Sequence, residues 1–286
     1  MPRMIELRAG DLLCRIEPAL GGCIAALKLG GVPVLRDAAS PLTTARQAGS
    51  YPLVPFSNRV GHARLRWEGT LYPLVRNNGD EPHAIHGVGW QRPWHVLDSG
   101  PDFALLSYEH KADESWPFAF DSSQGFRISA GSLELTLSIT NQSARPAPAG
   151  LGWHPFFMKR ARSHVRFRAG GRWEMDSDKL PTGRVASSGI DADCAALDVD
   201  HCFDGWDGTV ALRDEVFDIR LSSNLSRLVV FTHPRREHIA IEPVSHVNNA
   251  LALAAQGMDP AQLGLVTLGA GESLSAQMTI EVERIA

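Results

Sequence analysis

The sequence predicts an all-β fold, a large antiparallel β-sandwich with few short helices that occupies residues 1–286 as a single domain. Many short segments alternate apolar and polar residues with a period of two, which is the pattern of half-buried strands. Helical patterns are scarce, and strands do not alternate with helices, which argues against a parallel doubly wound sheet. The 26 glycines and 18 prolines supply the turns that a many-stranded antiparallel fold needs.

The individual elements follow from this alternation. The segments predicted as strands are residues 11–16, 103–109, 132–139, 165–168, 209–212, 216–221, 227–232 and 277–282. Gly131 is suited to a tight turn that pairs residues 125–129 with the strand beginning at residue 132. Asp214 marks a second hairpin, whose returning strand sorts its apolar and charged residues onto opposite faces. Residues 249–255 predict a helix of two turns after an asparagine cap.

The composition limits the partners and the location of the protein. The formal net charge is −4, so the charge balance does not favour a nucleic acid or an anionic membrane as partner. Four cysteines without a Cys-x-x-Cys pair predict buried free thiols in a reducing cytoplasm. The N-terminal segment lacks an apolar core, so no signal peptide is expected, and no apolar run reaches the length of a membrane span.

The most informative short segment is Gly152-Trp153-His154-Pro155-Phe156-Phe157. Because a proline follows it, His154 is expected to have an extended backbone. Its aromatic neighbours remove water from the imidazole and so lower its pKa, whereas a nearby carboxylate would raise the pKa. That balance suits a histidine that gives or takes a proton near neutral pH. The alternative is a core histidine whose ring is bonded to a backbone carbonyl.

Two further polar groups stand in apolar sequence. Glu242 ends the run His238-Ile239-Ala240-Ile241 and precedes Pro243, so we expect it at a sheet rim, where partial burial would make it a base. The alternative is an exposed glutamate at a strand end. His86 precedes Gly87, which permits close approach of a ligand to the backbone. His83 and His86 alone do not make a metal site, since a third ligand is missing, and His83 is interpreted as a loop or supporting residue.

Other residues suggest a site for a small sugar. Arg59, after Asn58 and a rigid apolar stretch with two prolines, is suited to bind neighbouring hydroxyl groups, although an ordinary surface ion pair is the alternative. Asp200 lies close to Trp206, and a carboxylate beside an aromatic ring is a common arrangement for holding a sugar. Trp116 is a further candidate ring face. Taken alone, an aromatic residue of this kind more often belongs to the core.

A locally basic stretch, residues 159–172, raises a second possibility. Such a run is typical of a solvated strand face, and a phosphate site for a sugar phosphate is the alternative. The sequence contains no Gly-x-Ser-x-Gly, no Gly-x-Gly-x-x-Gly and no P-loop, so hydrolase, dinucleotide and nucleoside triphosphate chemistry have no motif to support them.

The order of these pieces resembles the aldose 1-epimerase (galactose mutarotase) family, from about Gly21 to the C-terminus. The matching segments are Asn58-Arg59, His86-Gly87 followed by Trp90 and Trp94, residues 152–157, Asp200-His201-Cys202-Phe203, and Glu242. The resemblance implies a large antiparallel β-sandwich, in agreement with the strand pattern. It also implies an isomerase of carbohydrate metabolism that interconverts the α and β anomers of a free aldose without a cofactor or a metal.

The resemblance assigns roles to individual residues. Glu242 matches the general base that takes the proton of the anomeric hydroxyl, and His154 matches the general acid that protonates the ring oxygen. His86 matches a second active-site histidine. Arg59 and Asp200 match residues that hold sugar hydroxyls, and Asn58 is carried over with them.

The sequence also departs from the galactose type. Galactose-type members carry a glutamine on a strand before the glutamate, and this position corresponds here to Val229 or Val230. We therefore expect a contact to galactose to be missing, and the identity of the sugar stays undetermined. An epimerase for hexose 6-phosphates and a non-catalytic carbohydrate-binding β-sandwich remain as alternatives, and the oligomeric state stays open.

Overall fold

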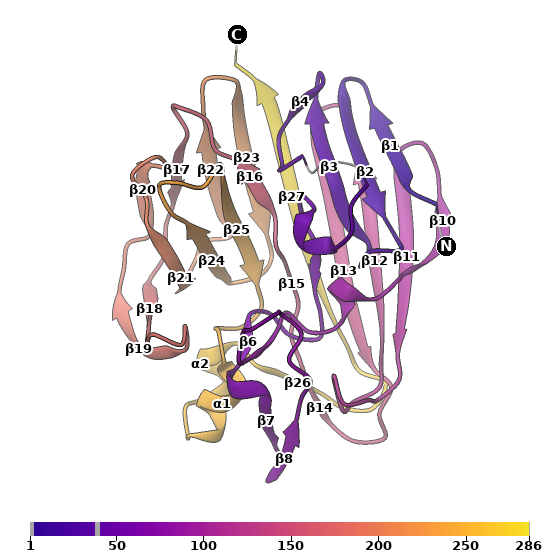
Figure 1. Ribbon diagram of the computed structural model, residues 1–286, viewed down its shortest axis with the longest axis vertical. Helices are drawn as coiled ribbons and strands as arrows, with labels where there is room; N and C mark the ends of the chain where they lie inside the picture. Colours follow the sequence, from indigo (N-terminus) through magenta and orange to yellow (C-terminus); the bar gives the residue numbers. More distant parts are fainter. Residues whose placement is uncertain (1–2, 38–40, 286) are drawn as a thin grey trace.

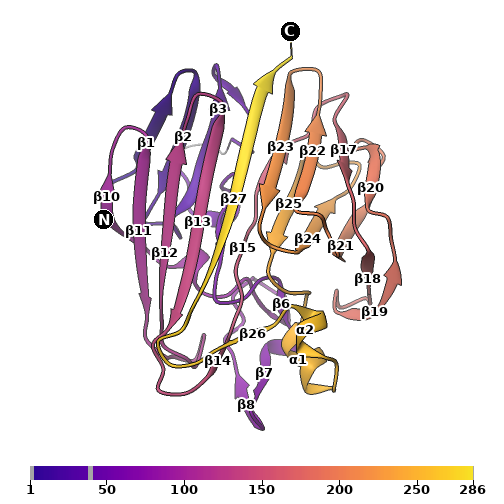
Figure 2. The same cartoon turned by 180° about the vertical axis from the view of Figure 1, so that it is seen from behind.

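The computed structural model describes residues 3–37 and 41–285. Two layers of antiparallel strands pack face to face (Figures 1 and 2), which confirms the predicted β-sandwich. One layer is a nine-stranded sheet that spans the whole width of the molecule. The other layer consists of a four-stranded and an eight-stranded sheet that lie side by side on one face of the first.

The nine-stranded sheet contains both predicted hairpins, β12–β13 around Gly131 and β22–β23 around Asp214. Within β23 the buried residues alternate with exposed ones, as the period of two predicts. The order of its strands is β10 (His95–Ser99), β11 (Phe103–His110), β12 (Phe120–Ile128), β13 (Ser132–Asn141), β27 (Ser273–Arg284), β23 (Phe217–Ser223), β22 (Thr209–Arg213), β17 (His164–Phe167) and β20 (Ile190–Asp193).

The second layer carries the site described below. Its four-stranded sheet is β1 (Ile5–Ala9), β2 (Leu12–Glu17), β3 (Cys23–Leu29) and β4 (Val32–Pro33). The order of its eight-stranded sheet is β19 (Pro181–Ala186), β18 (Gly171–Met175), β21 (Val199–Asp204), β24 (Arg227–Thr232), β25 (His238–Val244), β15 (Gly152–Trp153) and β5 (Pro52–Leu53), with β16 (Phe156–Met158) also paired to β25. Bridges between Ile24 and Ser50 and between Leu35 and Phe157 join the two sheets.

Short elements gather at one end of the sandwich, at the bottom of Figure 1. The paired strands there are β6 (Arg59–Val60) with β9 (Ala84–Ile85), β7 (Arg64–Trp67) with β8 (Thr70–Pro73), and β14 (Ala147–Ala149) with β26 (Val266–Leu268). Within the described residues, the α-helices are α1 (Ala250–Ala255) and α2 (Pro260–Leu263), and the 3-10 helices are η1 (Ala45–Gln47), η2 (Gly61–Ala63) and η3 (Gly89–Gln91).

The predicted helix at residues 249–255 is present as α1, but its predicted cap is wrong in detail. Asn249 stands at the cap position with a left-handed backbone, and its side chain bonds no helix N–H. Instead, its Oδ1 accepts a hydrogen bond of 2.9 Å from the backbone N–H of Gly61. The asparagine therefore ties α1 to the segment that follows β6.

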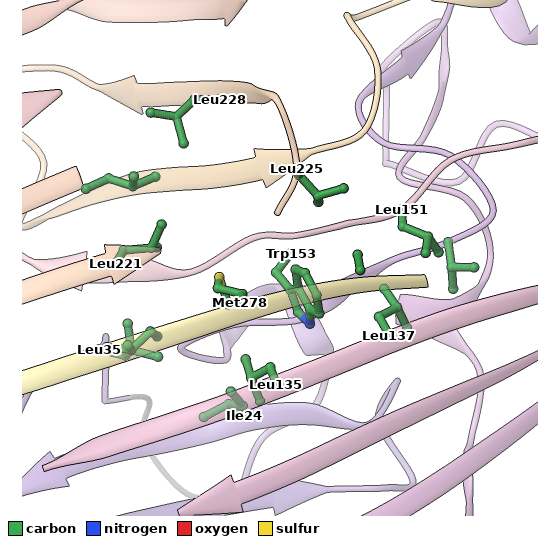
Figure 3. Close-up of a cluster of buried hydrophobic side chains, with 14 of the residues drawn as sticks. Ile24, Leu35, Leu135, Leu137, Leu151, Trp153, Leu221, Leu225, Leu228 and Met278 are labelled. Atoms are coloured by element: carbon green, nitrogen blue, oxygen red, sulfur yellow. The ribbon is translucent and has the colours of Figure 1, made fainter. Parts of the chain in front are cut away.

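The core lies between the two layers. Figure 3 shows part of it, where Trp153 packs among Leu135, Leu137 and Met278. The eight-stranded sheet is also covered on its other face, because a second buried cluster that includes Val229 packs there. Side chains of one strand therefore alternate between the core and this second face.

Two smaller expectations can be compared with the structure. The four cysteines, all within the described residues, are buried and unpaired, as predicted. None of the helices in the described parts of the chain has the length and apolar character needed to span a bilayer.

Candidate active site

A cavity lies on the face of the eight-stranded sheet that is turned away from the core. Val229 and Phe231 of β24 and Glu242 of β25 form part of its floor. Their chain neighbours Val230 and Ile241 belong to the core cluster instead. Because side chains of a strand alternate between faces, the same two strands supply both the core and the cavity floor.

Glu242 lies inside a strand and not at a sheet rim, so that prediction is wrong. Strand β25 continues through Pro243 to Val244, and Val229 of β24 faces Glu242 in the register. Proline lacks an N–H, but its backbone fits an extended strand, and Pro243 stands opposite Leu228. The Glu242 side chain is consequently on the cavity face with only 2% of the residue exposed.

His154 contacts Glu242 directly on the cavity floor. His154 Nε2 lies 3.1 Å from Glu242 Oε1, and both side chains are almost fully buried. The histidine is held in place by its backbone N–H, which donates to the Tyr51 carbonyl at 3.0 Å. One ring nitrogen of His154, Nδ1, and the second carboxylate oxygen of Glu242 have no hydrogen-bond partner among the described residues.

The environment shifts the pKa values of this pair in opposite directions. Burial raises the pKa of Glu242 well above its ordinary value, and the Asp200 carboxylate raises it further. Burial lowers the pKa of His154 well below its ordinary value, and the neighbouring His86 lowers it further. Both shifts favour a neutral pair that carries one exchangeable proton. A carboxyl and an imidazole that share a proton in a cavity are typical of acid–base catalysts.

His86 faces the same pair from the wall of the cavity. Its ring centroid lies 5.2 Å from that of His154, edge to face. The backbone N–H of Asn58 donates to His86 Nδ1 at 3.1 Å, which leaves Nε2 to carry the hydrogen of the neutral ring. Burial lowers the pKa of His86 to about 3, so the ring is neutral at ordinary pH. His86 is thereby fixed as a hydrogen-bond donor through Nε2.

The backbone around His86 adopts a conformation that most residues avoid. His86 and Asn58 have φ of 61° and 54°, in the left-handed region, and Gly87 follows with φ of 71°. A Cβ at Gly87 would lie 2.1 Å from the Val54 carbonyl oxygen. The close approach predicted for this glycine is therefore to the protein's own backbone. Left-handed residues that persist in this way are characteristic of functional sites.

The predicted sugar-holding residues Asn58, Arg59 and Asp200 all line the cavity. Arg59 Nε lies 2.5 Å from Glu81 Oε1, and its Nη1 donates to Asn58 Oδ1 at 3.2 Å. Arg59 is thus in an ion pair, as the alternative interpretation had it, but the pair is part of the cavity wall. Asp200 lies on the floor, 3.5 Å from Lys179 Nζ.

The two tryptophans predicted to contact the sugar do not reach the cavity. Trp116 is 1% exposed and packs between Phe56 and Phe118, and Trp206 is 5% exposed with its Nε1 donating to the Thr209 carbonyl. Both belong to the hydrophobic core, so the structure contradicts the predicted ring contacts. A local aromatic segment predicts burial, but it does not predict which side of the sheet the ring occupies.

Other residues line the cavity without having been singled out for it. Tyr51 and Trp90 stack with ring centroids 5.4 Å apart and form an aromatic wall beside His86. Glu81 completes the wall through its ion pair with Arg59. Tyr51 stands in the rigid stretch before Asn58, which is the one sequence signal that could have identified it. Arginines from three other segments also line the cavity and are considered below.

The remaining candidate residues serve other purposes. His83 accepts at Nδ1 from the backbone N–H of His62, and its Nε2 donates to the Asp178 carbonyl, which agrees with a supporting role. The basic stretch at residues 159–172 lies outside the cavity. Arg160 pairs with Asp214, for example. A phosphate site built from that stretch is therefore not present at the cavity.

Comparison with known proteins now bears on this geometry. Residues 3–281 match the family model described as aldose 1-epimerase. This chain belongs to the aldose 1-epimerase family. The name of the family denotes a carbohydrate epimerase, and the match extends over both sheets of the cavity-bearing layer and the nine-stranded sheet. The resemblance inferred from the ordered motifs is thereby confirmed.

One sequence relative and two solved structures are similar to this chain over nearly its whole length. An uncharacterised Escherichia coli K12 protein, YphB, is 28% identical over 281 residues, covering 92% of this chain and 93% of its own length. A crystal structure from Escherichia coli K12, provisionally described as an aldose 1-epimerase, has a TM-score of 0.89 at 28% identity and covers 99% of both chains. A galactose mutarotase-like protein from Clostridium acetobutylicum has a TM-score of 0.84 at 21% identity, covering 99% of this chain and 95% of its own.

Proposed function

We propose that this protein interconverts the α and β anomers of an aldose by acid–base opening and closure of the sugar ring. The observation that carries the proposal is the 3.1 Å contact between His154 and Glu242 on the cavity floor. Ring opening takes a proton from the anomeric hydroxyl and gives one to the ring oxygen, and both oxygens are attached to C1. An acid and a base only one hydrogen bond apart are suited to two oxygens on one carbon.

The proton balance of the reaction fits a pair that shares one proton. In its charged form, Glu242 accepts the proton of the C1 hydroxyl while His154 donates one to the ring oxygen, and the bond between C1 and the ring oxygen breaks. The pair is then neutral, which is the form that burial favours. The aldehyde turns about the C1–C2 bond, and the reverse transfers close the ring on its other face. No net proton is exchanged with water.

The surrounding residues would orient the sugar. His86 presents its Nε2 hydrogen to an oxygen of the substrate, because burial lowers the pKa of its ring and keeps the ring neutral. Arg59 supplies hydrogen-bond donors and Asp200 supplies acceptors for ring hydroxyls, since both residues line the cavity. Val229, which faces Glu242 in the register, is apolar, so it offers no hydrogen bond at the position that we compare with the glutamine of galactose-type members.

The test is mutarotation of pure α-glucose and α-galactose, followed by polarimetry. We expect the wild-type protein to accelerate the reaction and Glu242→Gln and His154→Asn each to lose a factor of about 10²–10⁴ in kcat. Matched controls are Glu174→Gln and His164→Asn, which make the same changes at exposed carboxylate and histidine pairs outside the cavity.

The outcomes separate an enzyme from a binding protein. Loss of rate in the two cavity variants but not in the controls would support the acid–base assignment. Sugar binding that is equal in wild type and variants, without acceleration of any aldose, would refute the proposal and favour a carbohydrate-binding module. Equal loss in all four variants would indicate damage to the fold, which circular dichroism would detect.

A further inference from the structure

Three arginines from separate segments line one end of the cavity. Arg36 follows β4, Arg46 lies in η1, and Arg236 lies in the turn between β24 and β25. None of these residues belongs to the acid–base pair or to the Arg59 and Glu81 pair. Three positive side chains converging on one cavity from distant parts of the sequence need a physical explanation.

These guanidinium groups have no carboxylate partner. The carboxylates that line the cavity have other neighbours, since Glu81 pairs with Arg59, Asp200 lies near Lys179, and Glu242 contacts His154. Among the residues that the structure describes, no Asp or Glu oxygen lies within 4.0 Å of Arg36, Arg46 or Arg236. This end of the cavity therefore carries uncompensated positive charge.

The arginines bond neutral groups only. Arg36 Nε donates to the Ala48 carbonyl at 3.1 Å, and Arg46 donates to the Asn78 side chain. Arg236 Nη1 donates to His238 Nε2 at 3.3 Å, while its Nε is buried without a hydrogen-bond partner. Carbonyls and amides orient a guanidinium group without neutralising it, so the positive charge and the N–H groups outside these bonds remain available to a charged ligand.

Aromatic rings on the cavity floor support two of the three. The Arg36 Cζ lies 3.9 Å from the ring centroid of Phe156, and the Arg236 Cζ lies 4.3 Å from that of Phe231. Both phenylalanines face Ala240 in the strand register, one from β16 and one from β24. The two guanidinium groups are thereby held over neighbouring positions of the same sheet face.

The charges of Arg46 and Arg236 act on Arg36. Burial lowers the pKa of Arg36 to about 10, and the positive charges of Arg236 and Arg46 lower it as well. Burial likewise lowers the pKa of His238 to about 4, with Arg36 and Arg236 as further causes. Like charges in a partly desolvated place are unfavourable unless an anion compensates them.

We propose that the aldose substrate carries an anionic group at its C6 end, bound by Arg36, Arg46 and Arg236; this rests on the mutarotase function proposed above. The position of the anionic group at C6 follows from the role of His154, which is assigned to protonate the ring oxygen of the sugar. The ring oxygen is bonded to C5, which carries C6, so the C6 substituent lies next to the proton donor. Phe156, whose ring carries Arg36, is 4.3 Å from the His154 ring, centroid to centroid. A carboxylate, sulfate or phosphate shares the chemistry that this site recognises.

The test compares one sugar series that differs only at C6: glucose, glucuronate, glucose 6-sulfate and glucose 6-phosphate. Exchange between the anomeric proton signals is measured by NMR at equilibrium, so pure anomers are not needed. We expect at least one anionic sugar to exceed glucose in kcat/KM by about tenfold to a hundredfold, the scale of a hydrogen bond to a charged group. The advantage should decrease as ionic strength rises. Comparison of the carboxylate, the sulfate and the phosphate shows which anionic group at C6 the site prefers.

Variants connect this preference to the arginines. We expect Arg46→Gln and Arg236→Gln each to reduce the ratio of anionic to neutral kcat/KM by about tenfold. Arg166→Gln is the matched control, because it removes the same charge from an exposed residue outside the cavity, and it should leave the ratio unchanged. Glucose equal to the best anion, or the same ratio in all three variants, would overturn the inference.

A binding measurement keeps the two proposals separable. Neither 1,5-anhydroglucitol nor its 6-phosphate has an anomeric hydroxyl, so calorimetry measures recognition without turnover. Tighter binding of the 6-phosphate that is lost in Arg236→Gln, without turnover of any sugar, would refute the mutarotase proposal and support the anion site. Turnover of glucose without any preference for anionic sugars or for this phosphate would refute the anion site and leave the mutarotase proposal standing.

Discussion

Gly87→Ala provides the sharpest test of how the backbone positions the site. Gly87 has φ of 71°, and an added Cβ would lie 2.1 Å from the Val54 carbonyl oxygen. The obstacle is backbone and not the end of a flexible side chain, so it cannot move aside without displacing the chain. Because His86 is the preceding residue, any displacement also moves a side chain that lines the cavity.

The expected loss of stability can be worked from these contacts. Alanine in the left-handed region costs about 1 kcal/mol relative to glycine. The Val54 carbonyl accepts hydrogen bonds from the N–H groups of Val88 at 3.0 Å and Gly89 at 3.1 Å. Displacing that carbonyl weakens both bonds, at about 1 kcal/mol each. We therefore expect Gly87→Ala to lower the free energy of unfolding by about 3 kcal/mol.

Gly69→Ala is the matched control for this prediction. Gly69 has φ of 77°, but a Cβ there would meet nothing within 4 Å. It should lose only the backbone contribution of about 1 kcal/mol. Urea denaturation gives both values, and mutarotation measures the site, where we expect only Gly87→Ala to lose about tenfold or more in kcat/KM. Equal losses of stability in the two variants would refute the assignment of the extra cost to the Val54 contact.

Two further predictions concern the pH dependence of the acid–base pair. The pair holds one proton between the lowered pKa of His154 and the raised pKa of Glu242, so kcat should be constant over that window and fall on both sides. Asp200→Asn removes a carboxylate that raises the pKa of Glu242, so the alkaline limb should move to lower pH; an unchanged limb would contradict that electrostatic effect. The raised pKa also predicts a stability change. The folded protein holds the Glu242 proton more tightly than the unfolded chain does. The stabilisation that this proton gives the folded state is fully present below pH 4.5, and it is lost as pH rises through the folded pKa of Glu242. Glu242→Gln cannot ionise, and its stability relative to wild type should rise over that window in urea denaturation; a constant difference would argue against a buried, protonated carboxyl.

Local patterns determined much of the fold. The alternation in residues 216–221 and the turn residues Gly131 and Asp214 predicted hairpins that the nine-stranded sheet contains. These elements are readable because a hairpin is closed by neighbouring residues, and the period of two records which side chains share a face. The ordered motifs around His154 and Glu242 were sufficient to suggest the family.

The local pattern did not show what covers each face of a strand. Glu242 was expected at a rim, yet β25 continues past Pro243 and the carboxyl is buried under the cavity. Trp116 and Trp206 were expected at the sugar, yet both lie in the core. A period of two shows that successive side chains point to opposite sides, but what covers each side depends on segments distant in the sequence.

The sequence by itself therefore determined the all-β class, two hairpins and the chemical identity of the candidate acid and base. Only the tertiary structure brought His154 to within hydrogen-bond distance of Glu242 and gathered Arg36, Arg46 and Arg236 at one end of the cavity. The physical reason is the range of the interactions. Strand period and turn geometry act between near neighbours in the chain, whereas the convergence of charges is produced by pairing between strands and by loops that lie far apart in the sequence.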